Sequence, residues 1–253
     1  MPGLKRLVAN ALGKVLDVSI VPHASIGLLF EREHLRRFLS EFHIDCVFDV
    51  GANAGQYGQM IRELGFRGAI ISFEPIPSMA NTLKKKVKHD TLWFVEEVAL
   101  DSEMRDTTFN VMRSSQFSSL NMPSHADTDL FREENAVAYT VELRTKLLST
   151  FISKYESQLE FKRPFLKMDT QGNDLAVAQG AGDFLSCFIG LQSELAIKKI
   201  YDSAGDYRSL IDYYTGRGFE LSALVPNNRG HFPTLIEIDC IMLNTRHRSD
   251  NRA

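Results

Sequence analysis

From about residue 45, short apolar runs alternate with stretches of helical periodicity, and this alternation constrains the fold more than any other feature of the chain. The pattern is typical of a parallel sheet that helices cover on both faces. The predicted strands of this part of the chain are 46–50, 69–73, 92–96, 165–169 and 187–192. The predicted helices between and after them are 55–64, 78–88, 173–179 and 204–216.

The end of the chain departs from this alternation. Strand patterns at 219–225 and 235–243 are joined by the turn 226–233, which is too short to hold a helix. Parallel neighbours need a crossover of a dozen or more residues, so this pair must be antiparallel. A parallel sheet closed by such a hairpin is the arrangement of class I methyltransferases. The expected fold is therefore α/β and Rossmann-like, with a doubly wound, mostly parallel seven-stranded sheet and an antiparallel C-terminal hairpin.

One insertion interrupts the regular pattern. Extra strands are predicted at 105–111 and 137–145, and the polar, serine-rich loop 113–136 between them is long enough to reach over the strand ends as a lid. We expect a main domain at 45–245 with this insertion at about 103–160, and a disordered tail at 246–253.

An N-terminal helical segment, 1–44, precedes this domain and is expected to pack on its core. Apolar residues within 4–16 recur at helical spacing. Such a stripe fits docking on the core, and it equally allows a membrane surface or a partner subunit. A homodimer through the N-terminal helix is therefore kept as an alternative.

Charge and composition exclude several function classes. The formal net charge of −3 gives no reason to expect a polyanion, so nucleic acid is disfavoured as a partner. No apolar stretch approaches the roughly 18 residues that span a bilayer, and the N-terminus does not read as a secretory signal. Cys46, Cys187 and Cys240 lie in separate apolar, strand-like runs without metal-ligand spacing. They are interpreted as buried, reduced thiols of a cytoplasmic protein.

A glycine-containing turn follows the first predicted strand and opens a helix. Gly51 allows a sharp reversal where a side chain would collide with a ligand, and Gly55 lets the helix start close against the strand. Glu74 ends the next strand, and its two carboxylate oxygens suit the vicinal diol of a ribose. The turn therefore predicts a nucleoside-binding site.

The identity of the nucleoside is open at this point, because an NAD-dependent oxidoreductase shares this layout. Its fingerprint, however, needs glycine at the position of Asn53, where the pyrophosphate approaches. Asp49 would also repel a pyrophosphate, whereas it could help to hold a cationic amino group. A non-catalytic cofactor-binding scaffold is a further alternative, because intact turn residues do not prove turnover.

The chain resembles the FkbM family of S-adenosylmethionine-dependent methyltransferases. The matching stretches, in family order, are VFDVGANAGQYG (47–58), ISFEPIP (71–77), VALDS (98–102), FLKMDTQGNDLAVAQGA (165–181) and LIEIDCIMLN (235–244). The resemblance implies O-methylation of a hydroxyl on a sugar, a polyketide or another natural product. It also implies a cofactor pocket lined by Asp49, Gly51, Asn53, Gly55, Glu74, Ala99, Asp101 and Ser119, with Ala99 and Asp101 near the adenine.

In open α/β sheets the ligand lies beyond the carboxyl ends of the strands. Asp169 ends a strand and is the first candidate for the base that activates the acceptor hydroxyl. Its alternative role is to orient the cofactor or to cap the following helix. His231, in the hairpin turn, is the second candidate base.

Gln171 and Glu194 are assigned to acceptor binding, although Glu194 could instead pair with Lys198 on a following helical turn. Mg²⁺ bridging Asp169 and Glu194 to acceptor hydroxyls is a further alternative. The sequence shows no compact acidic cluster, so we expect no metal.

Overall fold

The computed structural model describes residues 26–226 and 233–247. The apolar stripe within 4–16, His231 and residues 248–253 of the predicted tail 246–253 lie outside the described residues. The first two residues of that tail, Arg246 and His247, belong to a short 3-10 helix, η5 (Thr245–His247). The predicted domain boundaries, including that of the N-terminal segment 1–44, stay predictions.

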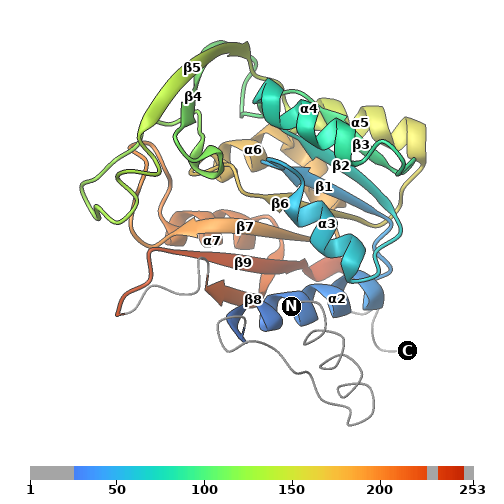
Figure 1. The fold of residues 1–253 in the computed structure, drawn as a ribbon. Helices are drawn as coiled ribbons and strands as arrows, with labels where there is room; N and C mark the ends of the chain where they lie inside the picture. The colour runs from blue at the N-terminus through green and yellow to red at the C-terminus, as the bar shows by residue number, and fades with distance from the viewer. Residues whose placement is uncertain (1–25, 227–232, 248–253) are drawn as a thin grey trace, which may run out of the picture.

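Seven strands form one sheet in the order β3-β2-β1-β6-β7-β9-β8 (Figure 1). Their bounds are β1 (Cys46–Val50), β2 (Ala69–Phe73), β3 (Trp93–Glu96), β6 (Pro164–Met168), β7 (Gly190–Ala196), β8 (Phe219–Pro226) and β9 (Glu237–Asn244). All neighbours pair in parallel except β9, which is antiparallel to both β7 and β8. The predicted doubly wound sheet with its C-terminal hairpin is confirmed.

Helices cover both faces of the sheet, as the continuous apolar strands require (Figure 1). The first face packs against α2 (Ile26–Glu41), α3 (Gln56–Glu63) and α4 (Pro77–Lys86). The second face packs against α5 (Leu148–Leu159), α6 (Asp174–Gly180) and α7 (Tyr207–Gly216). Of these, α5 was not predicted from the sequence. No helix among the described residues is long and apolar enough to cross a membrane.

The two faces of β1 pack into two different hydrophobic cores. Phe48 points into the core formed with α5, α6 and α7, and Val47 into the core formed with α2 and α3. Asp49 follows Val47 by two residues and therefore lies on the α2 and α3 face, near the end of the strand. On this face the sheet changes from apolar to polar toward its carboxyl edge.

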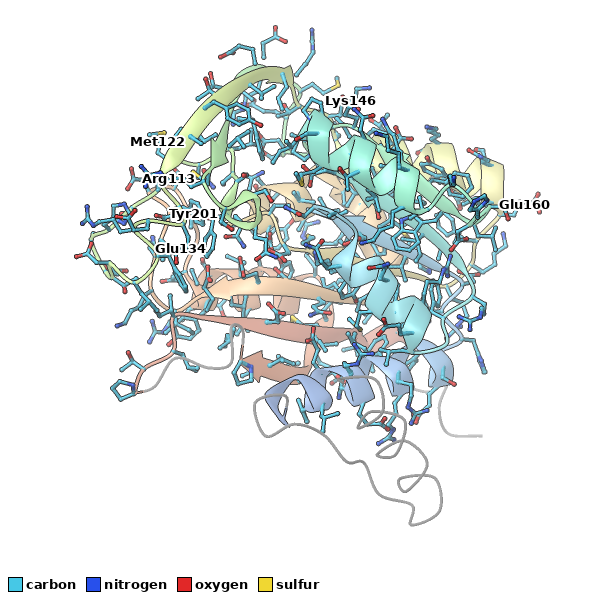
Figure 2. The ribbon with its side chains drawn as sticks, viewed as in Figure 1. Arg113, Met122, Glu134, Lys146, Glu160 and Tyr201 are labelled. Carbon is cyan, nitrogen blue, oxygen red and sulfur yellow. The ribbon has the colours of Figure 1, made fainter. Side chains whose placement is uncertain are left out.

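The predicted insertion forms a separate two-stranded antiparallel sheet, β4 (Asp106–Met112) and β5 (Val137–Arg144), which arches beside the main sheet (Figure 1). The loop between these strands contains a short 3-10 helix, η2 (Ser115–Phe117). Tyr201, which follows β7, donates from its hydroxyl to the Phe117 carbonyl over 2.7 Å and so holds η2 in place. Figure 2 labels Tyr201 among the side chains of this insertion.

The fifth predicted strand, 187–192, needs a correction at both ends. Cys187 is the last residue of a 3-10 helix, η3 (Gly182–Cys187), and it is half-buried rather than buried in a strand. β7 starts at Gly190, where a side chain would collide with the ring of Phe38. At the other end of β7, pairing with β6 stops at Ser193, but pairing with β9 continues to Ala196. Glu194 therefore lies inside the strand.

Candidate active site

A cavity of about 370 Å³ lies at the edge of the sheet where β1, β2, β6 and β7 end. Because β9 runs antiparallel, its first residues lie at the same edge. Residues of α2 and α3 line one side of the cavity, and η2 with its neighbours in the insertion lines another. The cavity therefore occupies the place where an open α/β sheet binds its ligand.

The turn after β1 is shaped by three residues in the left-handed region, Gly51, Asn53 and Gly55. Gly51 has a φ of 79°, and a Cβ there would lie 1.9 Å from the carbonyl oxygen of Asp169. Asn53 has a φ of 48°, a conformation that asparagine tolerates better than most residues. Its Oδ1 accepts from the Ala54 amide at 2.8 Å, and its Nδ2 donates to Ser115 Oγ at 3.1 Å. Asn53 thus shapes the turn and also joins it to the insertion.

Glu74 is held at the end of β2 with both of its carboxylate oxygens in use. Oε2 accepts from the Asn53 amide at 2.8 Å, and Oε1 accepts from the Ile76 amide at 2.7 Å. Only 3% of the residue is exposed, and burial raises its pKa to about 7. Each oxygen keeps a second lone pair, so the carboxylate can still accept from two further donors.

The surroundings of Glu74 are apolar. Phe73, Ile76, Val98, Ala99 and Leu100 line the cavity beside it. A fixed carboxylate with two free lone pairs, next to an apolar wall, matches a ribose diol joined to a planar base. The donor and acceptor groups present here therefore fit the nucleoside part of S-adenosylmethionine.

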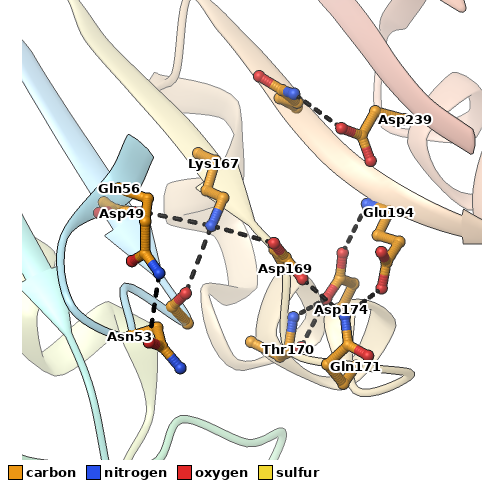
Figure 3. Close-up of polar contacts among 12 residues, drawn as sticks. Asp49, Asn53, Gln56, Lys167, Asp169, Thr170, Gln171, Asp174, Glu194 and Asp239 are labelled. Atoms are coloured by element: carbon orange, nitrogen blue, oxygen red, sulfur yellow. Dashed lines mark hydrogen bonds and ion pairs between the residues drawn. The ribbon is translucent and has the colours of Figure 1, made fainter. Parts of the chain in front are cut away.

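Lys167, the residue before the last of buried β6, links the turn to the candidate base (Figure 3). Its Nζ lies 3.4 Å from Asp49 Oδ1, 3.5 Å from Asp169 Oδ2 and 3.4 Å from the Gly51 carbonyl. Burial alone would lower the pKa of Lys167, but the carboxylates of Asp169 and Asp49 outweigh burial and raise it. The side chain therefore stays protonated and acts as a fixed positive charge.

Gln171 bridges two carboxylates that line the cavity. Its Nε2 donates to Asp169 Oδ1 and to Glu194 Oε2, both at 2.9 Å. Its Oε1 lies 2.7 Å from the Tyr201 hydroxyl, whose one proton is shared between this oxygen and the Phe117 carbonyl. The residue adopts a left-handed φ of 55°, which turns the chain sharply after Asp169. The structure thus brings the predicted residues Asp169, Gln171 and Glu194 together, and all three line the cavity.

Asp174, at the start of α6, ties this turn to β7. Its carboxylate accepts from the amide and hydroxyl of Thr170, from Ser193 Oγ and from the Glu194 amide. Burial raises its pKa. The side chain of Asp169 bonds to Gln171 and Lys167, and no side chain caps α6 at Asn173. The capping role considered for Asp169 is therefore not the one its contacts support.

The predicted cofactor residues fall into two groups. Gly51, Asn53, Glu74 and Ala99 line the cavity, whereas Asp49, Gly55, Asp101 and Ser119 do not.

The second group supports the walls of the site. Asp49 is buried behind Lys167, and a Cβ at Gly55 would lie 2.4 Å from Leu83 on α4. Asp101 pairs with Arg105 at 2.8 Å, and Ser119 Oγ donates to the Gln171 carbonyl at 2.7 Å. The roles assigned to both groups stay predictions.

Lys167 and a group of polar residues on β7 and β9 were not predicted from the sequence. Gln192 Nε2 donates to Glu31 Oε1 at 2.9 Å and to Asp239 Oδ2 at 3.1 Å. Glu237 also lines the cavity. The alternation of Glu237 and Asp239 with apolar residues in LIEIDC was the signal available, because alternate strand residues share one face.

Metal binding was considered for the pair Asp169 and Glu194. Among residues 26–226 and 233–247, no group of three or more His, Cys, Asp or Glu side chains has an arrangement that could hold a metal ion.

Comparison with known proteins gives one sequence match and several structural ones. The family model for the methyltransferase FkbM domain matches residues 49–221, which is well over half of the chain. No curated protein matches the chain by sequence.

Three similar solved structures illustrate the likeness in fold. A putative S-adenosylmethionine-dependent methyltransferase from Listeria monocytogenes has 8% identity and a TM-score of 0.47, over 87% of this chain and 99% of that one. An rRNA methylase from Streptococcus thermophilus has 8% identity and a TM-score of 0.45, over 89% and 99%. A magnesium protoporphyrin IX methyltransferase from Synechocystis, solved with bound SAM, has 8% identity and a TM-score of 0.45, over 89% and 86%. At these values the family assignment rests on the sequence match.

Proposed function

This chain belongs to the FkbM methyltransferase family, and from that premise we propose that it methylates a hydroxyl of a sugar, a glycan or another natural product. It is a methyltransferase, and its cofactor is S-adenosylmethionine. The oxidoreductase considered from the sequence is excluded by the family. The kind of acceptor and the roles of individual residues are what we propose here.

The half of the cavity around Glu74 is the proposed cofactor side. The Glu74 carboxylate accepts the two ribose hydroxyls, Ala99 and its apolar neighbours face the adenine, and the turn at Gly51 and Asn53 encloses the rest. When bound, the cofactor supplies an electrophilic methyl group on a sulfonium. The protein has to orient an acceptor against that group and exclude water.

Asp169 is the proposed base. It accepts the proton of the acceptor hydroxyl as the oxygen attacks, and Gln171 and Lys167 hold its carboxylate in place. Glu194, fixed by the same Gln171 amide, accepts from a second hydroxyl and orients the acceptor. His231 remains the second candidate base, in the part of the hairpin turn outside the described residues.

The observation that carries this assignment is the difference in exposure between two carboxylates of one cavity. Glu74 is 3% exposed, which suits a nucleoside that is enclosed on binding. The Asp169 side chain is 41% exposed, so an acceptor arriving from solvent can reach it. One cavity therefore offers an enclosed end and an open end.

The test is a methyl-transfer assay with labelled S-adenosylmethionine and a panel of sugars, glycans and hydroxylated natural products. Asp169→Asn should lower turnover by about 100-fold or more, the range for loss of a general base, without changing affinity for S-adenosylhomocysteine. Asp183→Asn, an exposed site on η3, is the matched control and should keep full activity. Full turnover by Asp169→Asn would exclude it as the base, and turnover only with acceptors that lack a hydroxyl would overturn the proposed acceptor class.

Two further proposals concern the setting of the enzyme. The three cysteines are free, which supports a reducing, cytoplasmic location. A homodimer through the N-terminal helix is tested by sedimentation of the full chain against a chain that starts at residue 26. A sedimentation coefficient that truncation leaves unchanged would remove the dimer proposal.

A further inference from the structure

The cavity is strongly acidic compared with the rest of the protein. Among the described residues that line it, six are acidic and one, Lys167, is basic, which leaves a formal charge of −5. The whole chain has a net charge of only −3. The acidic residues are Glu31, Glu74, Asp169, Glu194, Glu237 and Asp239.

Three of the six acidic residues lie on the neighbouring strands β7 and β9, on one face of the sheet. Glu194 on β7 lies directly opposite Asp239 on β9, and Glu237 follows at the next position of the same face. Like charges at opposite positions of an antiparallel pair repel each other. Burial raises the pKa values of Glu194 and Asp239, and the nearby charges of Glu237 on Glu194 and of Asp169 on Asp239 add to this effect. Burial with the nearby Asp169 raises the pKa of Glu237 to about 8.

Lys167, the only ammonium among the described residues that line the cavity, does not neutralise the carboxyl groups of Glu194, Glu237 and Asp239. Lys167 is already held by Asp49, Asp169 and the Gly51 carbonyl. It lies on β6, and Gln192 is its direct neighbour on β7. Gln192 on β7 therefore separates Lys167 on β6 from the carboxyl groups of Glu237 and Asp239 on β9.

Gln192 gives an independent sign that a donor is missing. The residue is 3% exposed and lines the cavity, and its Nε2 is occupied by Glu31 and Asp239. These two carboxylates fix the orientation of the amide. Its buried Oε1 has no hydrogen-bond partner in the structure. A buried amide oxygen is normally bonded, so this one needs a donor from a ligand.

We propose that the acceptor carries a protonated amine or a guanidinium, which binds against the wall formed by Gln192, Glu194, Glu237 and Asp239, beside the hydroxyl that reacts. The inference rests on the proposed function, because it assigns a charge to the acceptor of that reaction. An ammonium presents three hydrogen-bond donors and a guanidinium five, and neither carries a hydrogen-bond acceptor. Either group therefore matches a wall that offers carboxylate and amide oxygens as acceptors. The charged group is a recognition element, and the methyl group goes to oxygen.

The test compares matched pairs of small molecules on the chain saturated with S-adenosylhomocysteine. Each pair joins a cationic compound to its neutral analogue, such as methyl 6-amino-6-deoxyglucoside with methyl glucoside, or an amino alcohol with the corresponding diol. Dissociation constants are measured by ligand-observed NMR. The cationic member should bind at least about tenfold more tightly, the effect of one hydrogen bond to a charged group.

The variants that probe the wall are Glu237→Gln and Asp239→Asn, which keep its shape and remove its charge. Each should weaken binding of the cationic members and leave affinity for S-adenosylhomocysteine unchanged, which also verifies folding. Glu103→Gln, on an exposed side chain, is the matched control and should change neither quantity. Equal affinities within the pairs, or no binding of any cationic member at millimolar concentration, overturn the proposal.

Two other cations are tested in the same experiment. If the variants weaken binding of S-adenosylmethionine but not of S-adenosylhomocysteine, the wall serves the sulfonium and the proposal is overturned. If Mg²⁺ alone binds to the wild type, is lost in the variants and displaces the cationic compounds, the wall is a metal site and the proposal is overturned.

The position of the methyl group in the product separates this inference from the proposed function. A methyl group on nitrogen contradicts hydroxyl methylation while leaving the preference for cations intact. A methyl group on the oxygen of an acceptor whose charge has no effect on binding contradicts the inference and leaves the proposed function standing.

Discussion

Lys167 and Asp49 lie directly opposite each other on β6 and β1, with Lys167 Nζ 3.4 Å from Asp49 Oδ1. The Asp49 side chain is fully buried and that of Lys167 is 7% exposed. Because the same ammonium reaches Asp169, one buried charge connects the cofactor turn to the candidate base. The pair is therefore part of both the fold and the site.

Removing Lys167 should destabilise the protein. Lys167→Met leaves Asp49 buried without a cation, and breaking a buried ion pair on one side costs about 3–5 kcal/mol. Urea unfolding followed by circular dichroism measures this loss. The double variant Lys167→Met with Asp49→Asn removes both charges and should recover most of the stability. An equal loss in the single and double variants would show that the charge of Asp49 is not the cause.

Cofactor affinity should rise with pH near neutrality. The pKa of Glu74 is about 7 because of burial. In the proposed site the ribose hydroxyls donate to the ionised form of this carboxyl group. Binding therefore favours deprotonation, and affinity for S-adenosylhomocysteine should increase as the pH rises from about 6 to 8 and then level off.

Glu74→Gln is the control for this dependence. It should bind the cofactor product at least about tenfold more weakly, because hydrogen bonds to a charged acceptor are lost. The step near pH 7 should also disappear from titrations of this variant. A step of unchanged size would assign the titration to another group.

Gly51→Ala should prevent formation of the cofactor turn. The new Cβ would lie 1.9 Å from the Asp169 carbonyl oxygen, and the backbone has a φ of 79°. We expect loss of cofactor binding together with a lower melting temperature, measured by calorimetry. Gly216→Ala at the end of α7, where a Cβ meets nothing within 4 Å, should leave both unchanged. Normal cofactor binding by Gly51→Ala would show that the backbone at Asp169 can move away from the new Cβ.

Tyr201→Phe should loosen the acceptor side of the cavity. The change removes the one hydroxyl proton that the Phe117 carbonyl and Gln171 Oε1 share, and the loss of a donor costs about 1–3 kcal/mol for a buried acceptor. Because Gln171 holds Asp169, kcat should fall while affinity for S-adenosylhomocysteine stays constant. Tyr139→Phe, at a half-exposed position on β5, is the matched control. A parallel fall of kcat in both variants would remove the specific role of Tyr201.

The sheet could be predicted from the sequence because its strands are buried on both faces. The ranges 46–50 and 69–73 coincide with β1 and β2, since each is a short apolar run bounded by turn residues. The hairpin followed from the shortness of the turn 226–233 alone.

α5 was missed for a local reason. Its N-cap is Leu147, no side chain caps it, and its first turn has no acidic residue. The sequence therefore carries none of the usual signals of a helix start. Phe151 and Tyr155 stabilise this helix by packing on the sheet, and this tertiary contribution is invisible in a local pattern.

The residues of the candidate site that could be predicted are mainly those that a local sequence pattern marks. Gly51, Glu74 and Asp169 follow strands directly, so the position of the sheet edge was enough to select them. Gln192 and Asp239 lie within β7 and β9, and they meet the cavity only because of the register between these strands. That register is a tertiary fact, and an alternating strand pattern does not specify it.

The opposition of Glu194 and Asp239 also bears on how far natural selection can stabilise this protein. Two carboxyl groups facing each other across buried strands lower folding stability, and apolar residues there would give a sturdier sheet. Since we propose that these carboxyl groups bind the acceptor, we expect stability and activity to trade against each other at this edge. Selection for thermal stability is therefore expected to replace these carboxyl groups with apolar residues, and the resulting variants are expected to have lower catalytic activity.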